Sequence, residues 1–161
     1  MVNNNLPVTG MHTGVMVEQP GKDSVLFDPA GDYRKNDPYN PRPWGGDAFY
    51  GKDADLGSYV DHQRRTDGPD VNVYHFPVSA DDADKIRSNI DGKGAIDPGW
   101  CAVNVGDVLR GIGPFQGLGN TTTPSMMDGE MRRLQPPQQP QSPDDPILSP
   151  SSDNPDPSWY P

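Results

Sequence analysis

The chain has 161 residues, of which only 32% are hydrophobic, with 18 glycines, 20 prolines and a formal net charge of -10. The length fits one domain, and the low hydrophobic content argues against a fold that uses the whole chain. The negative charge argues against nucleic acid or an anionic membrane as the main partner, because either would repel the chain. A single cysteine excludes an internal disulfide framework, and no apolar run is long enough to span a membrane.

The N-terminal region predicts a β-hairpin. Residues 11–18 alternate in the manner of a strand, and residues 24–28 form a second apolar run. Pro20-Gly21 lies between them and is a turn signal. In an antiparallel hairpin the first strand begins where the second ends, so we expect His12 and Asp28 at neighbouring strand ends.

The middle of the chain predicts a long loop, a short helix and a third strand. Residues 31–51 are interrupted by proline and glycine, which indicates an irregular segment with Trp44, Phe49 and Tyr50 as anchors. Residues 55–65 suit a short helix, in which His62 is expected to be solvated. Residues 71–77 suit a strand, in which His75 is expected to be partly exposed, with a second imidazole of a site as the alternative.

Two further helices are predicted from their N-terminal signals. Ser79 is a good N-cap for a helix with a buried stripe at Ala83, Ile86 and Ile90. Thr123-Pro124 can begin a last helix, since proline is tolerated in the first turn. That helix carries Met127, Met131 and Leu134 on one side.

Residues 100–113 predict a buried helix that begins at the only cysteine. Pro98-Gly99 breaks the chain before it, and apolar residues recur at helical spacing after it. A thiol in the first turn faces unpaired N–H groups and the positive end of the helix dipole, which lowers its pKa and favours the thiolate. Cys101 is therefore a candidate nucleophile, and a buried structural cysteine is the alternative. Trp100 beside it either walls a substrate groove or accompanies a buried cysteine.

The composition divides the chain in two. Residues 1–134 are expected to form one α+β domain with an antiparallel sheet packed against the cysteine helix. Residues 135–161 are dominated by proline, glutamine, serine and aspartate and are expected to be a disordered tail. The polar start of the chain has no basic-then-apolar layout, so we expect no classical secretory signal.

Three residues together suggest thiol catalysis. A cysteine nucleophile needs a base, and that base needs a third group to fix its tautomer. Cys101, His12 and Asp28 are the candidates for those roles. The run from His12 to Val17 resembles the His-x-Gly-Ile/Val strand of NlpC-type (papain-like) cysteine peptidases, and Phe27-Asp28-Pro29-Ala30 stands where that family places its third residue. Because the cysteine helix follows the histidine strand, the order is similar to the circularly permuted branch of that family.

The resemblance implies a small papain-like domain that cleaves amide bonds through an acyl-cysteine intermediate. It further implies a bacterial toxin effector, delivered by a type VI-like secretion machine, that acts on peptidoglycan peptides in the target-cell periplasm. The implied partners are that substrate, or a protein substrate, and a cognate immunity protein. A cytoplasmic location is the alternative.

Other functions remain open from the sequence alone. The same three residues would serve a deamidase or an acyltransferase acting on host proteins or lipids, and an adaptor or binding module would need none of them. No cofactor is expected. A metal site built from Cys101, His12, His62 or His75 is not favoured, because no pair of these has metal-ligand spacing.

Overall fold

The computed structural model describes residues 1–5, 11–33 and 47–135. The predicted tail from residue 136 onward and the predicted anchor Trp44 lie outside these ranges. In the described part of the chain the fold is mixed α+β, with two small antiparallel sheets and four α-helices, which agrees with the predicted class.

Each sheet has three strands. The first has the order β2-β1-β6, and the second has the order β3-β4-β5. Their bounds are β1 Val2–Asn3, β2 His12–Thr13, β3 Val15–Val17, β4 Val25–Asp28, β5 Asp47–Tyr50 and β6 Val71–Asn72. The predicted hairpin is confirmed, because β3 and β4 pair antiparallel with Val15 opposite Phe27 and Val17 opposite Val25.

The α-helices are α1 Leu56–Thr66, α2 Ala80–Asp91, α3 Cys101–Leu109 and α4 Pro124–Leu134, with short 3-10 turns at Gly51–Asp53 and Gly113–Phe115. Three of the α-helices begin at a capping side chain. Asp55, Ser79 and Thr123 accept hydrogen bonds from the backbone N–H three residues on, which satisfies a donor that the helix itself cannot. All four predicted helices are confirmed, although α3 ends at Leu109 rather than running to residue 113. None of the helices in the described ranges is long and apolar enough to cross a membrane.

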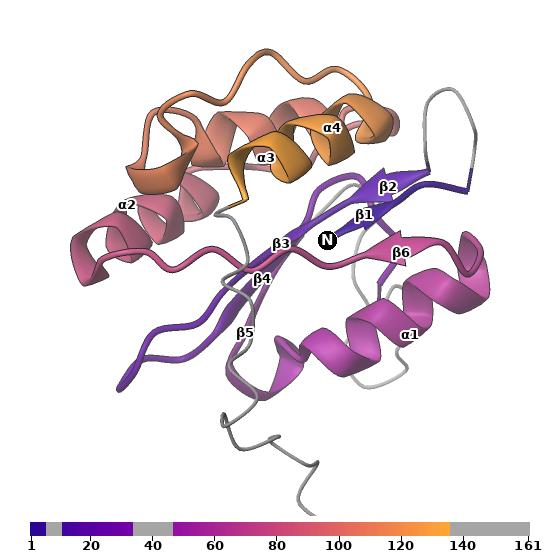
Figure 1. The fold of residues 1–161 in the computed structure, drawn as a ribbon. Helices are drawn as coiled ribbons and strands as arrows, with labels where there is room; N and C mark the ends of the chain where they lie inside the picture. The colour runs from indigo at the N-terminus through magenta and orange to yellow at the C-terminus, as the bar shows by residue number, and fades with distance from the viewer. Residues whose placement is uncertain (6–10, 34–46, 136–161) are drawn as a thin grey trace, which may run out of the picture.

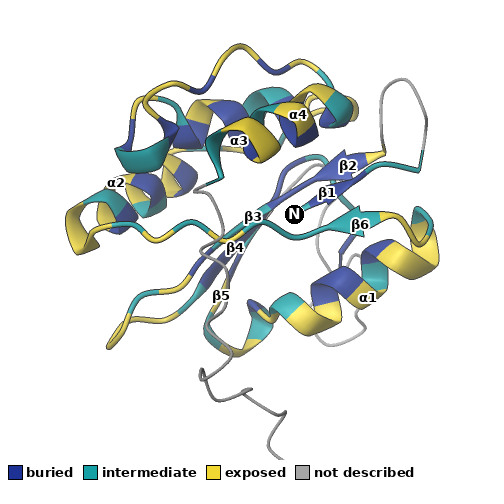
Figure 2. Cartoon of the chain, viewed as in Figure 1, coloured by how far each residue is buried: buried dark blue, intermediate teal, exposed yellow. Residues whose placement is uncertain are grey.

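The helices cover the strands from two sides (Figure 1). α2, α3 and α4 lie on one side, and α1 lies on the other. Each helix turns its buried residues toward the strands and its exposed residues toward solvent (Figure 2). β4 is buried on both faces, as the central strand of its sheet should be.

Alternation along β4 divides the core into two clusters. Val25 and Phe27 pack in the cluster that includes residues of α2, α3 and α4. Leu26 points to the opposite face and packs in the second cluster with Phe49 and Tyr59. Asp28 follows Phe27, so the period of two directs its side chain to the same face as Leu26, the face that carries Tyr59.

Three strand predictions need correction. Residues 11–18 do not form one strand, because the chain passes from the first sheet to the second at Gly14. The segment from 31 to 51 is not irregular throughout, since β5 pairs with β4 over four residues. Of the strand predicted at 71–77, only Val71–Asn72 pairs, and residues 73–78 continue without a strand assignment. In each case a long-range partner decides which residues pair, and the alternation pattern does not contain that information.

Candidate active site

His12 and Asp28 are in contact, although the strands that carry them belong to different sheets and not, as predicted, to one hairpin. His12 begins β2 and Asp28 ends β4, and the ring Nε2 lies 2.6 Å from Asp28 Oδ1. Both residues are buried, with whole-residue exposed fractions of 6% for His12 and 1% for Asp28. A buried imidazole and a buried carboxylate at this distance form a charge-assisted hydrogen bond.

Cys101 interacts with the same imidazole. It is the first residue of α3, it is 5% exposed, and its thiol interacts with the His12 ring through a hydrogen bond and through charge. Asp28 occupies Nε2, so Nδ1 is the ring nitrogen left for the thiol. The structure therefore brings the three predicted residues into one chain of contacts, Cys101–His12–Asp28.

The electrostatics of the site favour a charged pair. Burial opposes the charge on His12, but the Asp28 carboxylate and the Cys101 thiol together raise its pKa to about 10. Burial also opposes ionisation of Cys101, yet its interaction with His12 lowers the thiol pKa below its ordinary value. A raised histidine pKa and a lowered thiol pKa both shift the pair toward its charged form, an imidazolium beside a thiolate.

Asp28 is held by more than His12. Its Oδ1 also accepts a hydrogen bond from the Tyr59 hydroxyl at 2.5 Å, and its Oδ2 accepts one from the Tyr33 backbone N–H at 3.1 Å. Burial raises the pKa of Asp28, but His12 and these two donors outweigh burial and lower it. The carboxylate therefore stays ionised in a site from which water is largely excluded.

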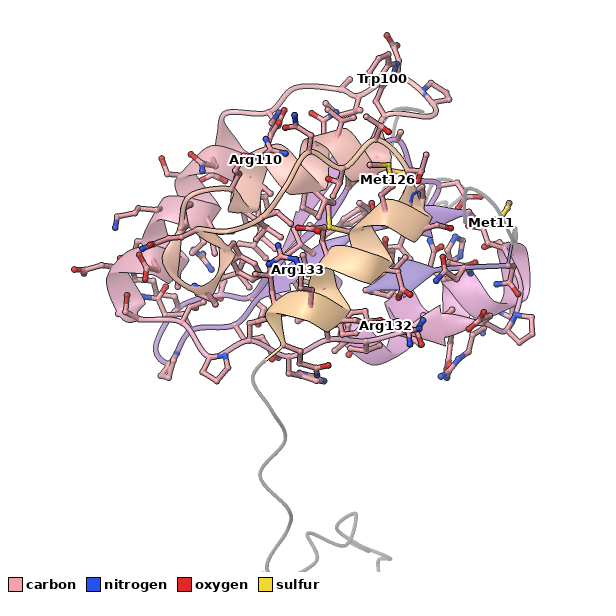
Figure 3. The ribbon with its side chains drawn as sticks, turned by 45° about the horizontal axis from the view of Figure 1, so that its top comes forward. Met11, Trp100, Arg110, Met126, Arg132 and Arg133 are labelled. Atoms are coloured by element: carbon pink, nitrogen blue, oxygen red, sulfur yellow. The ribbon has the colours of Figure 1, made fainter. Side chains whose placement is uncertain are left out.

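The start of α3 offers backbone donors beside the thiol. Trp100 is the N-cap and makes no side-chain capping bond, so no side chain of the cap occupies the first N–H groups of the helix. Such groups can stabilise an oxyanion that forms next to Cys101. Trp100 itself is 56% exposed and lies at the periphery of the molecule in Figure 3, so a buried cysteine follows an exposed tryptophan.

The other two histidines lie away from the thiol chain. His62 is not simply solvated, as the sequence suggested, because its Nε2 lies 2.6 Å from Asp32 Oδ1 and its ring packs against Tyr33. His75 is exposed, which agrees with the prediction for its exposure, although it is outside any strand. Among the described residues no group of three or more histidine, cysteine, aspartate or glutamate side chains could hold a metal ion.

Sequence reasoning missed two residues that act directly on this site. Tyr59 was visible only as an apolar residue of a helix, and nothing in the sequence connects it to Asp28, 31 positions away. Thr13 follows His12 and helps to lower the pKa of Cys101. Its place between His12 and Gly14 in the strand motif was the one available signal.

A cavity of about 280 Å³ lies near the site but does not contain the thiol. Its lining includes Gly14 and Tyr59, and it extends past Val105 and Leu109 of α3 to the 73–78 segment. Neither Cys101 nor His12 lines it. The candidate site is therefore defined by the contacts among Cys101, His12 and Asp28, and this cavity is not part of it.

Comparison of the sequence with protein-family models and with curated proteins, and of the fold with solved structures, found no match.

Proposed function

We propose that this protein is a thiol-dependent amide hydrolase, with Cys101 as nucleophile, His12 as general base and acid, and Asp28 as the residue that orients His12. The observation that carries the proposal is the buried contact chain from Cys101 through His12 to Asp28. A structural cysteine has no need of a buried imidazole with its own carboxylate, whereas a nucleophile requires both.

The reaction follows from these positions. The Cys101 thiolate attacks the amide carbon, and a C–S bond forms while the carbonyl oxygen becomes an oxyanion near the N–H groups at the start of α3. His12 gives its proton to the leaving nitrogen, and the C–N bond breaks. Water then attacks the thioester, His12 takes a proton from that water, and the C–S bond breaks to release a carboxylic acid and regenerate the thiol site.

Asp28 does not exchange a proton in this scheme. It accepts the Nε2 hydrogen bond throughout, which keeps Nδ1 directed at the thiol and stabilises the imidazolium. Its lowered pKa keeps it ionised for this role.

For the substrate, the proposal is a peptide bond of bacterial peptidoglycan, within a permuted NlpC-type, papain-like domain. Support for this comes from the motif around His12, the pairing of β3 with β4, and the position of Cys101 at the start of a later helix. The corresponding setting is a secreted antibacterial effector that acts in the target-cell periplasm and is neutralised by an immunity protein.

Purified peptidoglycan sacculi provide the test. We expect the protein to release soluble muropeptide fragments with new amino and carboxyl ends, and Cys101→Ala to release none. Hydrolysis that persists at the wild-type rate in Cys101→Ala would exclude the thiol mechanism. The wild-type protein could instead leave sacculi intact and release ammonia from a host protein, or transfer an acyl group to a host protein or lipid. If that activity depends on Cys101, the substrate assignment is wrong.

A further inference from the structure

The Asp28 carboxylate receives three hydrogen bonds, and two of them converge on one oxygen. His12 Nε2 at 2.6 Å and the Tyr59 hydroxyl at 2.5 Å both approach Oδ1, while the Tyr33 N–H approaches Oδ2. A carboxylate has about four lone-pair positions, so little of its hydrogen-bonding capacity is left unused. The position of Oδ1 is thereby set from two directions.

The fold makes room for the Tyr59 hydroxyl at this oxygen. Tyr59 is fully buried, and its ring packs edge-on against Tyr33 with centroids 5.1 Å apart. Gly14 lies beside the hydroxyl, and a Cβ at this position would overlap it. The glycine of the His-Thr-Gly motif is therefore a spatial requirement for the Tyr59–Asp28 bond.

Tyr59 stays a donor over the range in which the site works. Burial, followed by the negative charge of Asp28, raises its pKa well above the ordinary value, and Cys101 and Asp67 act in the same direction. These three groups are the charges that act most strongly on the phenol. A neutral hydroxyl that cannot ionise at neutral pH holds Asp28 without adding charge to the site.

We propose that Tyr59 is a positioning residue of the Cys101–His12–Asp28 site, which uses its hydroxyl to hold Asp28 in the orientation that presents the His12 ring to the thiol. This inference rests on the proposed thiol mechanism and extends it by one residue. Tyr59 acts through Asp28 and His12.

The hydrogen bond from Tyr59 to Asp28 affects the pKa of the Cys101 thiol. Without the hydroxyl, Asp28 loses one of its three donors, its ionised form is less stabilised, and its carboxylate can rotate. The imidazolium is then held less firmly beside Cys101. Because that imidazolium stabilises the thiolate, loss of the Tyr59 hydroxyl raises the thiol pKa.

Titration of the Cys101 thiolate by its ultraviolet absorbance tests the proposal without any substrate. The chain has one cysteine, so a Cys101→Ser variant provides the blank. At the pH where half of the wild-type thiol is ionised, we expect Tyr59→Phe to leave only about one tenth ionised. Circular dichroism establishes that the variant is folded.

Tyr50→Phe is the matched control. Its hydroxyl also donates to an aspartate at 2.5 Å, Asp91, but on the exposed surface and away from the thiol. We expect its titration to coincide with that of the wild type. Gly14→Ala keeps the phenol but displaces it, so we expect the same rise in thiol pKa as in Tyr59→Phe.

A folded Tyr59→Phe whose thiolate titration superimposes on the wild type would overturn the proposal, as would an equal shift in Tyr50→Phe. The result is independent of the substrate. A protein that releases nothing from sacculi but shows the shift keeps the role of Tyr59 and loses the proposed substrate.

Discussion

The described part of the chain contains two histidine–aspartate pairs with the same 2.6 Å separation and very different surroundings. In the His12–Asp28 pair the side chains are 8% and 2% exposed, whereas in the His62–Asp32 pair they are 20% and 43% exposed. Tyr33 lies between the pairs, with its backbone N–H on Asp28 and its ring against His62. Distance alone therefore does not distinguish the buried histidine of the candidate site from the more exposed one.

Two differences separate the pairs. Burial removes the solvent that would screen the attraction between His12 and Asp28, and a third group, Cys101, interacts with the His12 ring. The Asp32 side chain is partly exposed, so solvent screens its attraction to His62. Ion pairs at exposed positions contribute little to stability.

The largest contrast is expected between the two histidines. His12→Ala removes the base and the counter-ion of the thiolate, so we expect hydrolysis to fall by about 10³-fold or more. His62→Ala should leave the rate of hydrolysis within about threefold of the wild type, because the His62 side chain contacts neither Cys101 nor Asp28. Rates of fragment release from sacculi measure both. Equal losses would mean that His12 has been assigned the wrong role.

A smaller contrast is expected between the two carboxylates. Asp28→Asn preserves size but removes the charge that stabilises the imidazolium, so we expect a fall of about 10²-fold or more in kcat. Asp32→Asn should have almost no effect on kcat. Steady-state kinetics on a soluble peptide substrate provide the comparison, and unchanged kcat in Asp28→Asn would remove the carboxylate from the mechanism.

The third contrast concerns stability against pH. The pKa of His12 is raised from 6.5 to about 10 on folding, so its contribution to stability is complete below pH 6.5 and is lost progressively as the pH rises through 10. We expect His12→Gln to destabilise the protein by about 3 kcal/mol at pH 6, and the difference to shrink toward pH 10.

Both proteins in that measurement carry Cys101→Ser, which removes the titration of the thiol itself. Because the thiol also raises the pKa of His12, we expect the loss in this background to be complete below pH 10. Denaturant unfolding at several pH values gives the free energies. His62→Gln in the same background should cost no more than about 1 kcal/mol. A His12→Gln difference that does not change with pH would contradict the raised pKa.

Much of the site could be predicted from local sequence signals. The hairpin signal around Pro20-Gly21 predicts the pairing of β3 with β4, which brings the chain just after His12 beside the end of β4. The passage of the chain into the other sheet at Gly14, which places His12 in β2, is not contained in that signal. The apolar spacing after Cys101 was sufficient to place the thiol at a helix start. Both signals depend only on residues close in sequence.

The missed features depend on distant partners. Tyr59 acts on Asp28 across 31 positions, and its face of α1 is decided by how that helix packs on the second sheet. β5 was interpreted as loop because proline and glycine precede it, yet its pairing with β4 makes it a strand. His62 falls in the polar part of its helix, which predicts a solvated side chain, and its partner, Asp32, lies 30 positions away in the sequence. Propensity and periodicity carry no information about such pairings.

The most direct test of the central claim is an NMR titration of the His12 ring nitrogens in the wild-type protein. The resonance is assigned by its loss in His12→Gln, and His62 and His75 provide reference resonances in the same sample. If His12 is the imidazolium partner of the Cys101 thiolate, its ring stays doubly protonated at pH 8 and loses its proton near pH 10. Loss of that proton near pH 6.5, the value for an unperturbed histidine, would contradict the assignment of His12 and Asp28 as a charged pair that activates Cys101.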